Sequence, residues 1–214
     1  MLSDYLSIYS DAIELQREIA KKVIAEDTLH KEIEYICGID VSYKNNAAYC
    51  SAVIIKKNTL ELIESVDSNS VVRHPYISGL FILRESKPIL TTLKSLKNHF
   101  DLLLIDGHGQ LHPRKCGLAS YIGVLIDKPT IGVAKTLLCG SIMEDQSVEY
   151  DGTVLGFRIK KEGKKQIYVS VGHKISLTTA IKIIKEITKK EEWIPEPLRI
   201  ADLNSKKLVK SSLR

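Results

Sequence analysis

Apolar positions recur with two different periods along the chain. Leu15, Ile19 and Val23 recur every four residues, which predicts an amphipathic helix that starts near Ser10 and ends near Glu26. Three strand-like apolar runs follow, separated by short polar turns. These predicted strands span 35–41, 47–55 and 60–66. Because both connections between them are short, the three strands are expected to form an antiparallel meander.

The middle and end of the chain alternate helical patterns with short apolar runs. The predicted segments are a loop at 71–79, a helix start within 80–85, a second helical stretch from 86 with Pro88 near its first turn, strands at 102–105 and 130–134, a helix at 118–126, a hairpin of 153–159 with 166–171, and a helix capped by Ser176 that runs to Ile187. The two short apolar strands, at 102–105 and 130–134, are of the kind that is buried on both faces of a sheet. Residues 193–214 are expected to be mostly irregular.

This order of elements predicts the fold class. A meander followed by strand–helix–strand units favours an α/β fold, with a mixed β-sheet covered by helices on both faces. It is the element order of RNase H-like domains, although fold alone does not fix function. We expect residues 1–214 to form a single domain.

Composition narrows the protein class. The chain has 214 residues, 44% hydrophobic and 27% charged, which excludes fibrous and disordered chains. Its longest apolar runs, such as 122–126, are far shorter than the roughly 20 residues that cross a bilayer. The N-terminal segment 1–11 is acidic and carries no basic residue, so we expect no secretory signal and a cytoplasmic protein. The four cysteines form no metal-binding pattern and are expected to be reduced thiols.

The net charge of +5 is compatible with a polyanionic partner but does not require one. Lysines gather in two places, at 160–165 and at 206–214. The simpler interpretation of both is a solvated hairpin tip and a solvated C-terminal segment.

Two aspartates stand out at the ends of apolar strands. Asp40 lies between Ile39 and Val41, where a buried charge costs several kcal/mol unless it is paired or metal-bound. Asp106 follows the apolar run 102–105 and precedes a glycine loop, which is where open α/β sheets bind ligands. If the two strands are neighbours, the paired carboxylates suit Mg²⁺ or Mn²⁺ better than zinc. The alternative for Asp40 is a strand-end acid that faces water.

Other candidates carry weaker local signals. Glu85 reads in isolation as a surface acid on a helix, and Lys135 is notable only because it follows the strand at 130–134. His108, His112 and His173 sit in loops rich in Gly or Pro, where a histidine can ligate metal, act as a base or form a local hydrogen bond. The aromatic Tyr76 lies in a loop and is either a packed anchor or a wedge that replaces a flipped base. Together these residues suggest metal-dependent phosphodiester hydrolysis.

Five strings in this chain resemble the endonuclease V family in their order and spacing. They span 38–177 and read GIDVSY (38–43), PYISGLFILRE (75–85), DGHGQLHPRKCGLASYIGVLID (106–127), PTIGVAKTLLCG (129–140) and VGHKISL (171–177). The resemblance implies an RNase H-like fold and a Mg²⁺-dependent endonuclease, in which Mn²⁺ can substitute. It implies a monomeric enzyme of DNA repair that recognises deoxyinosine in DNA, with inosine-containing RNA as a further substrate, and that cuts the second phosphodiester bond 3′ to the lesion.

The resemblance also implies roles for individual residues. Asp40 and Asp106 would hold the metal, and Glu85 and His173 would complete the catalytic centre. Lys135 would stabilise the scissile phosphate, with His112 close by. The remaining implied residues contact nucleic acid, Tyr76 as part of the wedge and three glycines as the lining of the hypoxanthine pocket: Gly79, Gly107 and Gly109. The chain departs from the family's Pro-Tyr-Ile-Pro wedge at Ser78, which leaves the loop without its second proline.

Two alternatives remain open at this point. A resolvase-type nuclease that reads branched DNA would use the same acids, although the Tyr76 loop favours a single flipped base. A non-catalytic nucleic-acid binder would leave unpaired acids facing phosphate, an arrangement that only a metal makes favourable.

Overall fold

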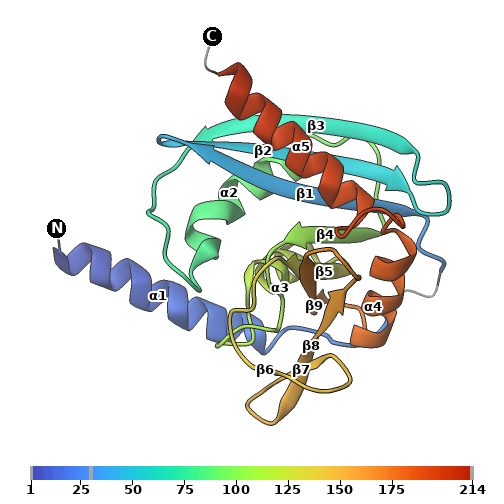
Figure 1. Cartoon of the computed structure of the whole chain (residues 1–214). Helices are drawn as coiled ribbons and strands as arrows, with labels where there is room; N and C mark the ends of the chain where they lie inside the picture. Colours follow the sequence, from blue (N-terminus) through green and yellow to red (C-terminus); the bar gives the residue numbers. More distant parts are fainter. Residues whose placement is uncertain (1, 29–30, 213–214) are drawn as a thin grey trace.

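A computed structural model describes residues 2–28 and 31–212 of the chain. A single nine-stranded mixed sheet forms the centre, and helices cover both of its faces (Figure 1). The predicted α/β fold class is therefore confirmed. The elements in chain order are α1 (Leu2–Ala20), β1 (Tyr35–Lys44), β2 (Ala47–Lys56), β3 (Leu62–Val71), α2 (Phe81–Lys94), β4 (Leu102–Asp106), α3 (Leu118–Ile126), β5 (Thr130–Ala134), β6 (Ser141–Ile142), β7 (Ser147–Tyr150), β8 (Thr153–Lys160), β9 (Gln166–His173), α4 (Leu177–Glu186) and α5 (Glu196–Ser211).

The strand order in the sheet is β3-β2-β1-β4-β5-β9-β8-β7-β6. The predicted meander β1–β2–β3 is antiparallel, whereas β1, β4 and β5 run parallel to one another. The carboxyl ends of these three central strands therefore meet at one edge of the sheet. Ile39 pairs with Ile105 between β1 and β4, so the next residue of each strand, Asp40 and Asp106, comes to that same edge.

Strand β4 divides the core into two layers. Its side chains alternate, so Leu102 and Leu104 pack on one face of the sheet and Leu103 and Ile105 on the other. The first face is covered by α4 and α5, and the second by α2 and α3. Because both faces are buried, this strand tolerates no polar residue until its last position, which is Asp106.

The structure corrects three of the predicted elements. The segment expected to be irregular contains the 16-residue helix α5, which packs against β1 and β2. The two stretches expected around Ser86 are one helix, α2, with Pro88 buried inside it. Helix α1 runs from Leu2 to Ala20, whereas it was expected to start near Ser10 and to end near Glu26. Within the described residues, no helix is both long enough and apolar enough to cross a membrane.

Candidate active site

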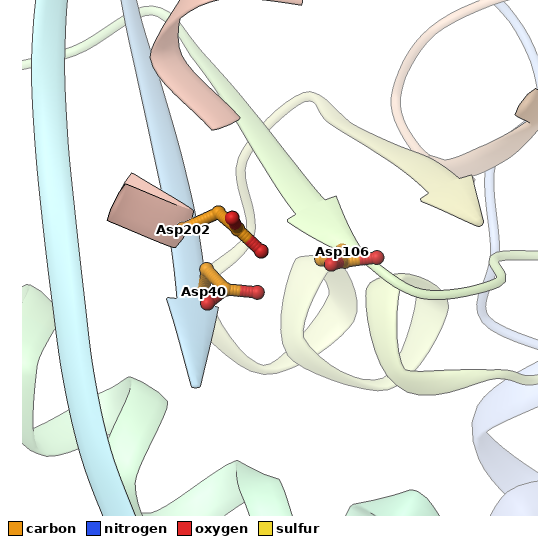
Figure 2. Close-up of side chains that lie close together, drawn as sticks. All are labelled: Asp40, Asp106 and Asp202. Atoms are coloured by element: carbon orange, nitrogen blue, oxygen red, sulfur yellow. The ribbon is translucent and has the colours of Figure 1, made fainter. Parts of the chain in front are cut away.

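Three carboxylates from three separate elements converge at the carboxyl edge of the central strands (Figure 2). Asp40 comes from β1, Asp106 from the end of β4 and Asp202 from α5. One oxygen of each lies within 4.8 Å of one oxygen of the others. The register of β1 and β4 brings the first two together, and the packing of α5 across β1 adds the third.

Asp40 is the most buried of the three, with 7% of its surface exposed. Burial, and then the charge of Asp106, raises the pKa of its carboxyl group well above the ordinary value. The Ser205 hydroxyl of α5 donates a hydrogen bond of 2.6 Å to Asp40 Oδ2 and partly offsets this effect. Burial and the neighbouring negative charge therefore disfavour the ionised form of Asp40, and the positive charge of a bound cation would favour it.

Lys135 provides the main positive charge at the site. Its Nζ lies 2.5 Å from Asp106 Oδ2 and 3.3 Å from Asp202 Oδ1. Burial opposes the charge on this lysine, but the carboxylates around it more than compensate and raise its pKa. Lys206, on the next turn of α5, pairs with the other oxygen of Asp202 at 2.6 Å. Asp202 is therefore held between two lysines.

Glu85 adds a fourth acid from helix α2. Burial, and after it the negative charges of Asp106 and Asp40, raises the pKa of its carboxyl group to about 8. Glu85 is thus near the carboxylate trio, although it does not belong to the set of mutually close oxygens. Glu85 is half-buried and senses the charges of Asp106 and Asp40, which a surface acid would not do; its part in the catalytic centre stays a prediction.

The donor set fits a hard divalent cation. Three carboxylate oxygens approach one point from separate elements, and the pKa values of Asp40 and Glu85 are raised by burial and by mutual repulsion. Oxygen-only ligand sets suit Mg²⁺ or Mn²⁺, whereas zinc prefers nitrogen and sulfur. The four free cysteines of the chain contribute no ligand to this cluster.

A pocket of about 180 Å³ opens beside Asp106. Since pockets for drug-sized ligands begin at roughly 300 Å³, this one suits a group the size of a single base. Its wall includes residues of several segments: Tyr76, Gly79, Gly107, His108, His112 and Lys135. The Tyr76 ring is 64% exposed at the rim and stacks edge-on against Phe81, with the ring centroids 5.1 Å apart.

The carbonyl of Gly79 is the best-anchored group of this pocket. It accepts hydrogen bonds from three side chains: Gln16 Nε2 at 3.2 Å, His112 Nε2 at 3.1 Å and Arg114 Nη2 at 2.6 Å. Gly79 has a positive φ of 78°, a conformation that favours glycine. The backbone of the Tyr76 loop is therefore fixed where it enters the pocket.

His112 belongs to the pocket wall rather than to the carboxylate centre. Its Nδ1 accepts a hydrogen bond from the backbone N–H of Arg114, so the proton is on Nε2, which donates to Gly79. Burial, and then the positive charge of Arg114, lowers the pKa of His112 to about 4. The ring is consequently neutral and positions the loop.

Two expected site residues lie elsewhere. His173 ends β9 and pairs with Thr130, whereas Asp106 pairs with Val133 near the other end of β5. Its ring accepts a hydrogen bond from the Ile24 N–H, so the expected catalytic role of His173 does not fit its position. Gly109 lies behind the pocket wall, where a Cβ atom would come within 2.0 Å of the Val171 carbonyl oxygen. Its role is close packing of the loop on the sheet, while Gly79 and Gly107 do line the pocket.

Asp202 is the member of the carboxylate trio that the sequence prediction missed. A signal was present, because Leu198, Ala201 and Ser205 recur at helical spacing and all three are buried. Proline at the first turn of α5 is a further helix-start signal.

Comparisons with known proteins agree on one family. The family model described as endonuclease V matches residues 17–203. Endonuclease V of Thermofilum pendens is 44% identical over 193 residues, which are 88% of this chain and 83% of that protein. Endonuclease V of Dictyoglomus turgidum is 41% identical over 213 residues, 96% of this chain and 92% of that protein.

Solved structures agree as well. The crystal structure of Streptomyces avermitilis endonuclease V superposes with a TM-score of 0.88 at 29% identity, and covers 96% of this chain and 94% of that one. Ciona intestinalis endonuclease V, solved in complex with a 24mer DNA containing an inosine followed by a ribo-adenosine, superposes with a TM-score of 0.85 at 29% identity. That match covers 96% of this chain and 99% of the Ciona chain.

Proposed function

The chain belongs to the endonuclease V family, a family of nucleases, and from that premise we propose that it is a divalent-metal-dependent endonuclease specific for inosine in nucleic acid. The observation that carries the proposal is the trio Asp40, Asp106 and Asp202 next to a base-sized pocket with an exposed tyrosine at its rim. We further propose Mg²⁺ as the metal, with Mn²⁺ as a substitute, and the second phosphodiester bond 3′ to inosine as the bond that is cut.

The three aspartates would hold the metal. When bound, the cation supplies the positive charge that polarises a water molecule and neutralises the scissile phosphate. A bound cation would lower the raised pKa of Glu85, and its carboxylate would then be able to accept a proton from the attacking water. Lys135 Nζ, already beside Asp106 and Asp202, is placed to pair with a non-bridging phosphate oxygen.

The pocket would hold the flipped hypoxanthine base. Tyr76 would fill the gap that the base leaves in the stack, because its exposed ring is supported from behind by Phe81. Gly79 and Gly107 allow backbone groups to approach a ring closely, and the Gln16–His112–Arg114 set keeps that backbone in place. The complex of the Ciona relative with inosine-containing DNA supports this use of the pocket.

A cleavage assay tests the proposal. Oligonucleotides with one inosine, as duplex DNA, single-stranded DNA and RNA, are incubated with Mg²⁺ or with EDTA. We expect cutting only with the metal and only in inosine-containing strands, and product length reports the cleaved bond. Comparison of the three substrates ranks DNA against RNA. Binding without cutting would favour a non-catalytic module, and cutting of branched DNA without inosine would favour a resolvase.

A further inference from the structure

A second groove adjoins the carboxylate centre on the side of the β8–β9 hairpin. Its lining includes Lys160, Lys164 and Lys165 of the hairpin, and Trp193 of the segment before α5. It meets the base pocket at Lys135 and Thr136, which line both. A chain that places one nucleotide in the base pocket would therefore pass Lys135 before it reaches this groove.

The charge of this groove is unbalanced. Lys160, Lys164 and Lys165 are exposed, and no carboxylate of the described residues forms an ion pair with any of them. Many other lysines do have such a partner, including Lys57, Lys174 and Lys189. A groove with several unpaired lysines attracts a polyanion, and it does so without reading base identity.

The groove is also a fixed feature of the fold. Lys161 does not line it and donates hydrogen bonds to the carbonyl oxygens of Lys189 at 2.6 Å and Glu192 at 2.9 Å. These bonds join the hairpin to the segment that carries Trp193. Lys165 Nζ lies 5.7 Å from the centroid of the Trp193 ring, which positions its charge at the groove wall.

We propose that this groove binds the sugar–phosphate backbone of the substrate strand beyond the scissile phosphate, on the side away from the inosine. The proposal rests on the proposed function, because that function puts inosine in the base pocket and the scissile phosphate at Lys135. Since the proposed cut is 3′ to inosine, the nucleotides in the groove are those 3′ of the cut. The solvated hairpin tip expected from sequence becomes one wall of the substrate site.

The test removes two charges from the hairpin tip. The double variant Lys164→Gln/Lys165→Gln is compared with Lys94→Gln/Lys97→Gln, which removes the same charge at the end of α2, beside β2 and β3 at the opposite side of the sheet. Lys164→Arg/Lys165→Arg keeps the charge and should retain parental affinity. Binding is measured in Ca²⁺ on single strands of equal length, with inosine near the 5′ end or near the 3′ end.

We expect the hairpin variant to lose affinity only for strands that extend 3′ of the cut. The slope of log affinity against log salt should fall by about 1.5, because each lost phosphate contact removes roughly 0.7–0.9. Turnover at saturating substrate should match the parent chain. An equal loss on all strands, a loss confined to 5′ extensions, or no loss would each overturn the proposal.

The proposed function is checked separately in the parent chain. If the parent cuts no inosine-containing strand, that function fails before any variant is compared. Strands without inosine then still report whether the hairpin lysines bind a nucleic-acid backbone, since their affinity should fall with the variant and not with the control.

Discussion

Gln16 on helix α1 accepts a hydrogen bond of 2.7 Å from Nε of Arg114, across 98 positions of sequence. The amide nitrogen of the same side chain donates to the carbonyls of Cys116 at 2.7 Å and Gly79 at 3.2 Å. One buried glutamine thus joins α1, the loop after β4 and the Tyr76 loop. The first helix of the chain takes part in shaping the base pocket, although it contributes no charged group to it.

Replacing Gln16 with methionine should loosen this junction. The variant leaves partners of the glutamine unsatisfied, so we expect a loss of about 1–3 kcal/mol in the free energy of unfolding. Affinity for inosine-containing strands should weaken, while turnover at saturating substrate stays near the parent value. Denaturant unfolding and binding titrations measure both. The control is Gln146→Met, which removes a glutamine that bonds Arg158 away from the pocket. Unchanged inosine affinity would restrict Gln16 to a structural role.

Asp40→Asn should separate stability from activity. Burial and the charge of Asp106 raise the pKa of Asp40, so a neutral side chain relieves repulsion and the metal-free variant should be at least as stable as the parent. Saturation with Mg²⁺ at about 100 times its Kd would stabilise the parent by about 2.7 kcal/mol, a gain that the variant should lose along with cleavage. Thermal unfolding with Mg²⁺ and with EDTA reports this difference. A variant that cuts at the parent rate is incompatible with Asp40 as a metal ligand.

Lys135→Met should tighten cation binding and slow the reaction. Removing a charge beside Asp106 and Asp202 leaves more net negative charge for the cation, and we expect affinity to rise about tenfold. Turnover should fall on the order of 10²-fold, as for loss of one electrostatic donor. Lys206→Met is the matched control, since it pairs with Asp202 alone and should tighten the cation without slowing the reaction. Equal turnover losses in the two variants would contradict a specific phosphate role for Lys135.

Tyr76→Ala should weaken inosine binding by about 5- to 150-fold, the equivalent of the roughly 1–3 kcal/mol of one base–aromatic stack. The loss should be largest in matched duplexes, because more stacking is broken there when the base flips. Tyr76→Phe keeps the ring against Phe81 and should bind like the parent. Titrations on matched, mismatched and single-stranded substrates in Ca²⁺ make the comparison. The same loss on all three substrates would indicate a general backbone contact instead.

Glu196→Gln should weaken the start of α5 in a pH-dependent way. Arg199, followed by Lys189, lowers the pKa of this nearly buried carboxyl group from 4.5 to about 2 in the folded chain. Its stabilisation is therefore fully present above pH 4.5 and lost as the pH falls towards 2. We expect the variant to be less stable by about 3 kcal/mol at neutral pH and to approach the parent at low pH. A difference that does not change with pH would exclude this ion pair as its cause.

Much of the sheet could be predicted because its central strands are mostly apolar. The helix at 118–126 and the strand at 130–134 have the predicted bounds, because the spacing of their apolar residues fits only one kind of element. Asp40 and Asp106 were singled out because each is a charge next to an apolar run, although β1 continues beyond the predicted end at 41 to Lys44.

The hydrophobic pattern of α5 is weak, although Leu198 and Ala201 are buried in the core. Ser205 is fully buried, because it bonds to Asp40, while Leu203 is 53% exposed. These two positions weaken the amphipathic pattern of the helix, so the helix was not predicted and Asp202 was missed with it.

The position of His173 depends on strand direction, which the sequence does not show. Strand β9 runs antiparallel to β5, so its carboxyl end lies at the edge of the sheet away from Asp106. A parallel β9 would have put the histidine beside the carboxylates.

The origin of Asp202 in α5 has a consequence for protein synthesis. Asp40 and Asp106 emerge from the ribosome before the third carboxylate, which belongs to the last helix of the described residues. The trio can assemble only after α5 has left the exit tunnel and docked on β1 and β2. A nascent chain that still lacks this helix has only two of the three carboxylates, so the order of synthesis alone fixes the order in which the trio is assembled.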